Sequence, residues 1–274
     1  MPTRTAFYGM NRIDKIFADL RKEGRRALMP FLTAGDPDLK TTAALLPALE
    51  AAGASVCELG IPFSDPIADG PVIQASMTHA LAGGVRPADV LEMVSKVRGK
   101  LDMGLVAMVS YSIVYRLGGG NFLRDAAEAG IDGFIVPDLP LEQCTDTAAA
   151  AANHGLVCSM LVAPTTPQDR SERIVKASSG FVYLLARSGL TGERTELPPQ
   201  LRGRIERLQA VTSLPIAVGF GVSNREQVRQ VVKLADAAIV GSAIMRRVDD
   251  LRAQSLSARV EGVRSFVTDL SAGL

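Results

Sequence analysis

The chain has 274 residues, of which 47% are apolar and 22% charged, and its 30 basic and 29 acidic residues leave a formal net charge of +1. This composition is typical of a globular protein and excludes a largely disordered chain. The near-neutral charge, without a concentrated basic patch, argues against nucleic acid as a partner. No apolar run reaches the roughly 18 residues that a membrane span needs, so we expect a soluble chain without a membrane segment.

Neither the cysteines nor the histidines are spaced like metal ligands. Cys57, Cys144 and Cys158 are odd in number, so we expect reduced thiols in a cytoplasmic protein. His79 and His154 lie far apart in the sequence and belong to no cluster of ligand residues. We therefore expect no metal site, and a catalytic role for either histidine is a minor alternative.

A helical pattern near the N-terminus precedes a unit that repeats along the chain. Apolar residues at helical spacing predict an extra helix over residues 12–23. Short apolar runs then alternate with glycine-rich or polar turns and helical stretches, which indicates a parallel α/β fold. The eight runs expected to be strands are residues 27–31, 55–61, 105–111, 133–136, 157–162, 181–185, 215–219 and 237–240. Eight strand–helix units without a linker predict a single-domain (β/α)₈ TIM barrel over residues 1–274.

Capping residues support this division into units. We expect Asp36 to cap a helix that begins at the following proline, and Thr166 precedes a proline in the same way. Ser223 and Glu226 have the spacing of a capping box directly after the seventh predicted strand.

The second predicted strand carries acidic residues where barrel enzymes hold their functional groups. Glu58 lies near the carboxyl end of this strand, and Asp65 and Asp69 lie in the loop that follows. A carboxylate in a buried strand is costly, which favours a catalytic role for Glu58 over a satisfied structural one. Asp65 precedes a proline, so a role in the turn is the simpler interpretation. Glu58 and Asp69 are the expected acid–base pair.

Glycines follow the last two predicted strands, where this fold usually binds phosphate. Residues 219–223 and 241–243 are glycine-rich and lead into helices, whose free N–H groups attract anions. Ordinary tight turns are the alternative interpretation. The long polar loop over residues 186–196 has the composition of a mobile lid, with a plain surface loop as the alternative.

These motifs closely resemble those of the tryptophan synthase alpha subunit family. Residues 58–71, ELGIPFSDPIADGP, match its signature, and residues 30–37, 137–140 and 188–192 support the match. The resemblance implies a lyase that cleaves indole-3-glycerol phosphate into indole and glyceraldehyde 3-phosphate during tryptophan synthesis. It also implies no cofactor in this chain and a beta partner that carries pyridoxal phosphate in an alpha2–beta2 tetramer.

The resemblance assigns roles to individual residues. Glu58 is expected to protonate indole C3 and to help deprotonate the side-chain hydroxyl, while Asp69 holds the indole N–H. Tyr183 lies beside them, and Thr191 reaches Asp69 when the lid closes. The residues implied for the phosphate are Gly192, Gly219, Phe220, Gly221, Gly241 and Ser242. The residues implied for the indole pocket are Leu28, Met108, Ile135 and Val162.

The chain departs from the family pattern at two places. Residues 110–114, SYSIV, replace a Tyr-Asn-Pro-like turn, and Leu28 stands where an aromatic residue is common. One rival interpretation is another phosphate-binding barrel, but no lysine or pair of aspartates lies at the strand ends where such an enzyme needs them. A second is a silent subunit that only activates a partner, against which the intact Glu58 and Asp69 argue.

Overall fold

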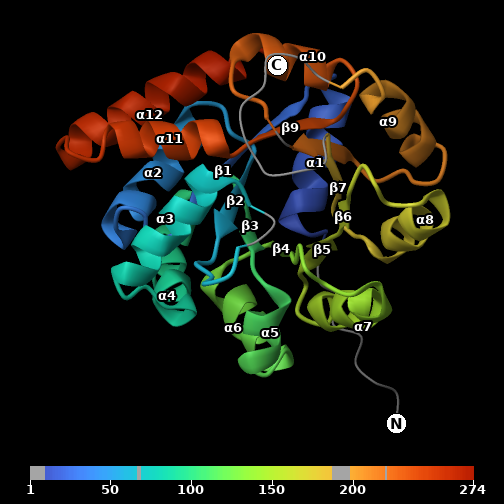
Figure 1. The fold of residues 1–274 in the computed structure, drawn as a ribbon, viewed down its shortest axis with the longest axis horizontal. Helices are drawn as coiled ribbons and strands as arrows, with labels where there is room; N and C mark the ends of the chain where they lie inside the picture. The colour runs from blue at the N-terminus through green and yellow to red at the C-terminus, as the bar shows by residue number, and fades with distance from the viewer. Residues whose placement is uncertain (1–9, 67–68, 187–197, 220) are drawn as a thin grey trace.

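The chain forms a barrel of parallel strands surrounded by helices (Figure 1). A computed structural model describes residues 10–66, 69–186, 198–219 and 221–274. Within these residues nine strands form one sheet in the order β5-β4-β3-β2-β1-β9-β8-β7-β6, and all neighbours run parallel. The strands are β1 (Ala27–Thr33), β2 (Val56–Gly60), β3 (Gly104–Met108), β4 (Gly133–Ile135), β5 (Val157–Ser159), β6 (Leu161–Val162), β7 (Val182–Leu185), β8 (Ile216–Gly219) and β9 (Ala237–Val240).

The two ends of this strand order are consecutive in the sequence, which brings the sheet round into a barrel. β5 and β6 are separated by Met160 alone and together occupy the run 157–162 that the sequence predicts as one strand. The predicted (β/α)₈ barrel is therefore confirmed, with its fifth strand interrupted. The expectation that the third strand reaches Tyr111 was wrong, because β3 ends at Met108 and Tyr111 already begins a helix.

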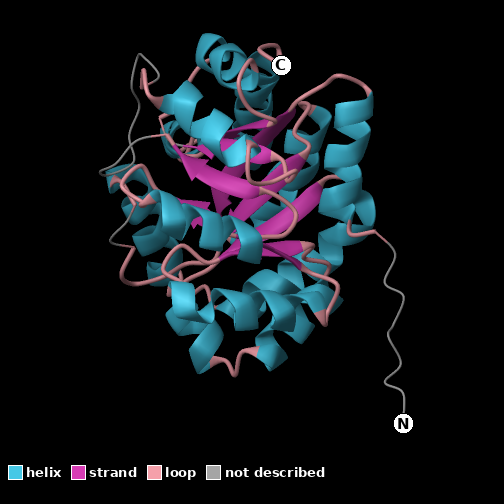
Figure 2. Cartoon of the chain, turned by 90° about the vertical axis from the view of Figure 1, so that its right-hand side faces the viewer, coloured by secondary structure: helices cyan, strands magenta, loops and turns pink. Residues whose placement is uncertain are grey.

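Helices cover the outside of the barrel, and the strands lie in the middle of the molecule (Figure 2). The helices of the described residues are α1 (Arg12–Lys22), α2 (Leu39–Ala51), α3 (Pro71–Ala82), α4 (Pro87–Val97), α5 (Tyr111–Arg116), α6 (Gly120–Ala129), α7 (Leu141–Ala152), α8 (Gln168–Ala177), α9 (Leu201–Gln209), α10 (Arg225–Val232), α11 (Ser242–Asp250) and α12 (Leu256–Ser271), with a 3₁₀ turn at Arg98–Lys100. None of these helices is long and apolar enough to cross a membrane.

Alternation along the strands separates two apolar cores. Side chains of one parity point into the barrel and those of the other pack against the helices, since successive residues of a strand face opposite sides. Ala27 and Met29 of β1 belong to the inner core, whereas Leu28 belongs to the outer one. The predicted extra helix is α1, and its buried Ile13 and Phe17 join the inner core and close one end of the barrel.

Two predicted helix starts were wrong by one or two residues. α2 is capped by Asp38, which accepts a hydrogen bond of 2.6 Å from Thr41 N, whereas Asp36 lies buried and pairs with Arg252 at 2.7 Å. Asp36 is engaged in this ion pair, and Asp38, the residue directly before α2, takes the cap position. Thr166 does not cap α8 either, since its hydroxyl accepts from Ala163 N at 3.0 Å.

The predicted capping box before α10 is also displaced by one residue. Asn224 is the N-cap and accepts a hydrogen bond of 3.0 Å from Gln227 N. The side-chain oxygen of Gln227 in turn accepts from Ser223 N at 2.7 Å. The start of α10 is therefore held by two local side-chain hydrogen bonds.

Candidate active site

Glu58 is a fully buried carboxyl group inside the barrel. It lies on β2, where it pairs with Phe31 of β1 and Val106 of β3, and its exposed fraction is 0%. Both of its carboxyl oxygens are buried and have no hydrogen-bond partner among the described residues. Burial without compensation favours the neutral form, and it raises the pKa of Glu58 well above the ordinary value. The site thus holds a carboxylic acid able to donate a proton near neutral pH.

Asp69 is the second acid at this end of the barrel. It lies in the loop between β2 and α3, and burial raises its pKa to about 6. The backbone is held from both sides, because Asp69 N donates to Pro66 O at 3.0 Å and Gln74 Nε2 donates to Asp69 O at 2.8 Å. Asp69 is therefore largely ionised at neutral pH, while burial favours the protonated form of Glu58.

Tyr183 lies near the two acids, on the opposite wall of the barrel. It points inward from β7 and is buried. Burial raises its pKa well above the ordinary value, and the nearby charges of Glu58 and Asp69 raise it further. Its ring and hydroxyl lie so close to the Gly219 backbone that a Cβ there would collide with them. The structure therefore brings Glu58, Asp69 and Tyr183 together, as expected.

A pocket of about 250 Å³ opens beside Asp69. Met108, at the end of β3, lines it together with Ile61 and the carboxylate-bearing Asp138. Asp138 accepts hydrogen bonds of 2.7 Å from both Ser110 Oγ and Tyr111 N and thereby fixes the turn after β3. The departure at residues 110–114 thus forms an ordered capped turn at the rim of the pocket.

Two of the four predicted indole-pocket residues were assigned to the wrong face of their strands. Leu28 and Val162 both belong to the outer core, and Val162 pairs with Leu184 on the side of the helices. The inward residue on β6 is Leu161, which pairs with Tyr183 and packs against the inner core. Ile135 does lie inside the barrel.

Sequence reasoning overlooked Phe31, although the pattern of β1 contains the signal for it. Counting every second residue from Ala27 and Met29 reaches Phe31, although its buried ring packs with the outer core. Its ring covers Gly60 so closely that a Cβ on that glycine would lie 2.6 Å from the ring. An aromatic residue is therefore present on β1, nearer to the carboxyl end of the strand than Leu28.

The glycine that follows β9 begins a helix without a side-chain cap. Gly241 is the N-cap of α11 and Ser242 its first residue, and no side chain caps this helix. A Cβ on Gly241 would meet no atom closer than 3.6 Å. Gly221 has a φ of 81°, a conformation that favours glycine. The free N–H groups of α11 can therefore receive an anion, whereas α10 has a side-chain cap on Gln227 N.

Three predicted site residues, Thr191, Gly192 and Phe220, lie outside the described residues. In the part of the chain that is described, no group of three or more histidine, cysteine or acidic side chains could hold a metal ion. All three cysteines are free and buried.

Known proteins match this chain over most of its length. The family model for the tryptophan synthase alpha chain matches residues 17–272. The chain belongs to this family. The alpha chain of Synechococcus sp. (strain CC9902) is 48% identical over 88% of this chain and 90% of the relative. That of Acaryochloris marina is 46% identical over 95% of this chain and 98% of the relative.

Solved structures of the family share the fold. Tryptophan synthase from Mycobacterium tuberculosis superposes with a TM-score of 0.86 at 35% identity and covers 97% of this chain and 98% of that one. The alpha subunit from Legionella pneumophila gives 0.86 at 33% identity, with 97% and 98% covered. The chain is thus a lyase that catalyses the alpha reaction of tryptophan synthesis, the cleavage of indole-3-glycerol phosphate into indole and glyceraldehyde 3-phosphate.

Proposed function

We propose that Glu58 and Asp69 carry out this cleavage by acid–base chemistry that requires no cofactor in this chain. The observation that carries the proposal is the burial of Glu58, whose two oxygens have no partner among the described residues although it lies inside the barrel. A carboxyl group kept neutral in this way is suited to donate a proton to carbon.

The reaction then proceeds in two proton transfers. Glu58 donates its proton to indole C3, and the positive charge that develops at the indole nitrogen is stabilised by the ionised Asp69, which accepts the N–H. The Glu58 carboxylate next removes the proton from the hydroxyl on the carbon attached to the ring. The bond between that carbon and indole C3 breaks, its electron pair returns to the ring, and an aldehyde forms. Glu58 is protonated again at the end.

The other end of the substrate is held by backbone groups. The phosphate binds at the N-terminus of α11, with Gly241 and Ser242, and the glycines after β8 complete the site together with Gly192 and Phe220. Gly219 also has a structural task, since only a residue without Cβ leaves room for the Tyr183 hydroxyl. Phe31, Met108 and Leu161 provide apolar surface for the indole ring. Thr191 closes over the substrate and orients Asp69.

Proton transfer to C3 can be tested separately from bond cleavage. Indole is incubated in D₂O with the protein and glycerol 3-phosphate, and the C3 proton is followed by NMR. The wild-type protein should speed the loss of this signal, and Glu58→Gln should not, whereas Glu128→Gln, which changes an exposed acid on α6, should behave as wild type. Exchange at the wild-type rate in Glu58→Gln would refute the role of Glu58.

We further propose a beta subunit carrying pyridoxal phosphate as the partner, in an alpha2–beta2 tetramer located in the cytoplasm. The candidate docking surface surrounds the pocket and includes Asp65 and α5, where Tyr115 is 76% and Leu117 44% exposed. Titration of a beta subunit into the indole-release assay should increase the rate strongly, and Tyr115→Ser should weaken the response. An unchanged rate at saturating beta subunit would contradict the partnership without affecting the chemistry.

A further inference from the structure

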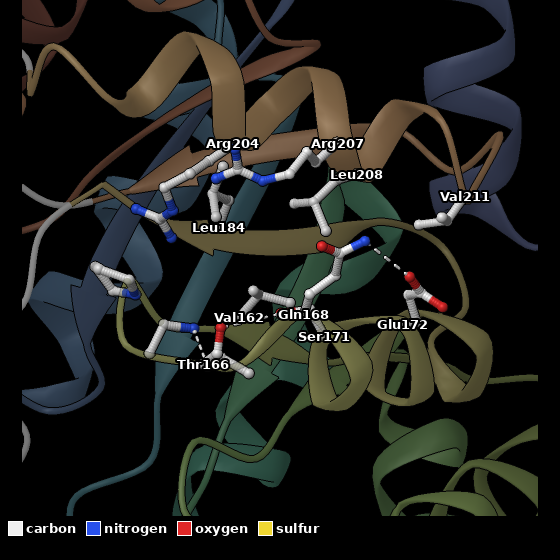
Figure 3. A pocket seen from close by; sticks show the side chains of 12 residues that line it. Val162, Thr166, Gln168, Ser171, Glu172, Leu184, Arg204, Arg207, Leu208 and Val211 are labelled. Carbon is white, nitrogen blue, oxygen red and sulfur yellow. Dashed lines mark hydrogen bonds between the residues drawn. The ribbon is translucent and has the colours of Figure 1, made fainter.

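A second pocket lies on the outer side of the barrel, between α8 and α9 (Figure 3). Its volume is about 290 Å³, comparable to that of the pocket beside Asp69. Val162 and Leu184, which belong to the outer core, form its floor. Leu208 and Val211 add apolar surface at one end. The pocket is therefore separate from the inward-facing acids and has an apolar interior.

Two arginines from α9 reach over one side of this pocket. Figure 3 shows Arg204 and Arg207 on the side opposite to α8. One guanidinium nitrogen of Arg204 donates to Ala186 O at 3.2 Å, while the other, Nη2, is buried and has no hydrogen-bond partner among the described residues. Burial lowers the pKa of Arg204, and the nearby charge of Arg207 lowers it further. The two cations thus lie close enough to repel each other.

No acid of the described residues forms an ion pair with either arginine. Glu172 lines the opposite side of the pocket, but its carboxylate accepts from Gln168 Nε2 at 3.3 Å. By contrast, Arg202 on the same helix is paired with Glu206 at 4.0 Å and lies in solvent. Arg207 is exposed to solvent, whereas Arg204 keeps one buried N–H without an acceptor among the described residues, which is costly.

Hydroxyl groups at the start of α8 extend the polar side of the pocket. Thr166 and Ser171 both line it. The hydroxyl of Ser171 donates to Pro167 O at 3.0 Å, so its lone pairs remain available. The Ser171 hydroxyl therefore offers acceptors, and the donors for a carboxylate or a phosphate are the guanidinium groups, which bind both in a forked geometry.

We propose that this pocket binds a small amphipathic anion, with its anionic group on Arg204 and Arg207 and its apolar body against Val162, Leu184 and Leu208. The proposal is independent of the chemistry assigned to Glu58 and Asp69. An anion there places a negative charge beside the two guanidinium groups and relieves the repulsion between the two cations. The apolar body itself leaves water when it packs against Val162, Leu184 and Leu208, which are already buried in the free chain.

Three small molecules distinguish the contribution of the anionic group from that of the apolar body. Phenylacetate carries both an anion and an apolar ring, 2-phenylethanol carries the ring alone, and inorganic phosphate carries the anion alone. Each is titrated into the full chain without substrate and followed by NMR chemical shifts. We expect phenylacetate to bind with a dissociation constant on the order of millimolar. The other two probes should bind at least about tenfold more weakly.

Variants of α9 locate the site. Arg204→Gln and Arg207→Gln should each weaken phenylacetate binding by about tenfold, because each removes one charge-assisted interaction. Arg202→Gln is the matched control and should leave binding unchanged. Circular dichroism verifies that all three variants remain folded. Equal binding of phenylacetate and 2-phenylethanol, or wild-type affinity in both pocket variants, would overturn the proposal. Because these experiments measure binding alone, their failure would be distinct from failure of the proposed lyase chemistry.

Discussion

Two sides of the barrel, at the carboxyl ends of the strands, differ in the groups that carry charge. On the side of β2, Glu58 and Asp69 are acids whose pKa values are raised by burial. On the side of β9 and α11, glycine backbone and an uncapped helix start offer N–H groups without any charged side chain. The acid side changes its protonation during the reaction, whereas the glycine side presents fixed dipoles to a permanently charged phosphate.

This difference has a consequence for stability. Holding an acid away from water opposes folding, because the unfolded chain solvates the same group at no cost. An uncapped helix start exposes donors to water and to ligand and carries a smaller penalty. Substitution of the acids should therefore slow the reaction and stabilise the folded state. Substitution of the glycines should weaken phosphate binding.

The largest effect is expected for Glu58→Gln. Removing a positioned acid or base typically lowers the rate by about 10²–10⁴-fold, and here one group serves both proton transfers. Indole release should therefore fall by at least about 10³-fold, while calorimetry still detects binding of glycerol 3-phosphate. A variant that keeps a tenth of the wild-type kcat would show that Glu58 does not transfer the proton.

Asp69 should determine how the rate depends on pH. Since burial raises its pKa to about 6, protonation below that pH removes the negative charge that the developing indole cation needs. The kcat/KM of the wild-type protein should fall as the pH drops through about 6, and Asp69→Asn should be slower by about 10²-fold. The slow variant should lose this acidic limb, and an acidic limb that persists in Asp69→Asn would assign it to another group.

On the glycine side, Gly241→Val should weaken binding instead of chemistry. Its side chain fits against Phe31 but fills the approach to the start of α11, so affinity for glycerol 3-phosphate should fall by about tenfold or more. Indole alone should bind as before. Gly203→Val on α9, which bears none of the proposed phosphate contacts, is a control for a general loss of helix stability. Unchanged phosphate affinity in Gly241→Val would place the anion elsewhere.

The smallest effect concerns stability. The pKa of Asp69 rises from its ordinary value of 3.8 to about 6 in the folded chain, so the folded chain holds this proton to higher pH than the unfolded chain does. The contribution of Asp69 to stability therefore falls as the pH rises from about 4 through about 6. Allowing for partial exposure, Asp69→Asn should be more stable than wild type by about 1 kcal/mol at pH 8 and by nearly nothing at pH 4. Urea unfolding at the two pH values measures the difference.

A stability difference that did not grow with pH would contradict the picture of an uncompensated acid at residue 69.

The sequence predicted the barrel and the acid pair because each has a strong local cause. Eight apolar runs required buried parallel strands, and a carboxylate at the end of such a run is too costly to be accidental. Whether a strand side chain points into or out of the barrel was less well predicted. Val162 was placed inside the barrel although counting by two from Val157 reaches Leu161, and the same count on β1 identifies Phe31 where Leu28 was chosen.

The predictions of the helix caps were wrong for a different reason. Asp36, Thr166 and Ser223 all have cap-forming side chains, but tertiary partners or a neighbouring residue determine which group takes the cap position. The ion pair between Asp36 and Arg252 joins residues 216 positions apart, so no local pattern could reveal it. The pocket between α8 and α9 was likewise not predicted from the sequence, because its two arginines have the pattern of ordinary surface charges.

The central claim is that Glu58 carries a proton at neutral pH in the free protein. Infrared difference spectroscopy between the wild type and Glu58→Gln at pH 7 tests it most directly, because a neutral carboxyl group and a carboxylate absorb in different regions. The account predicts that the substitution removes a band of a protonated carboxyl in an apolar environment, and that this band persists well above the pH at which an exposed glutamate ionises. Loss of a carboxylate band at pH 7 instead would show that Glu58 is ionised and would contradict the account.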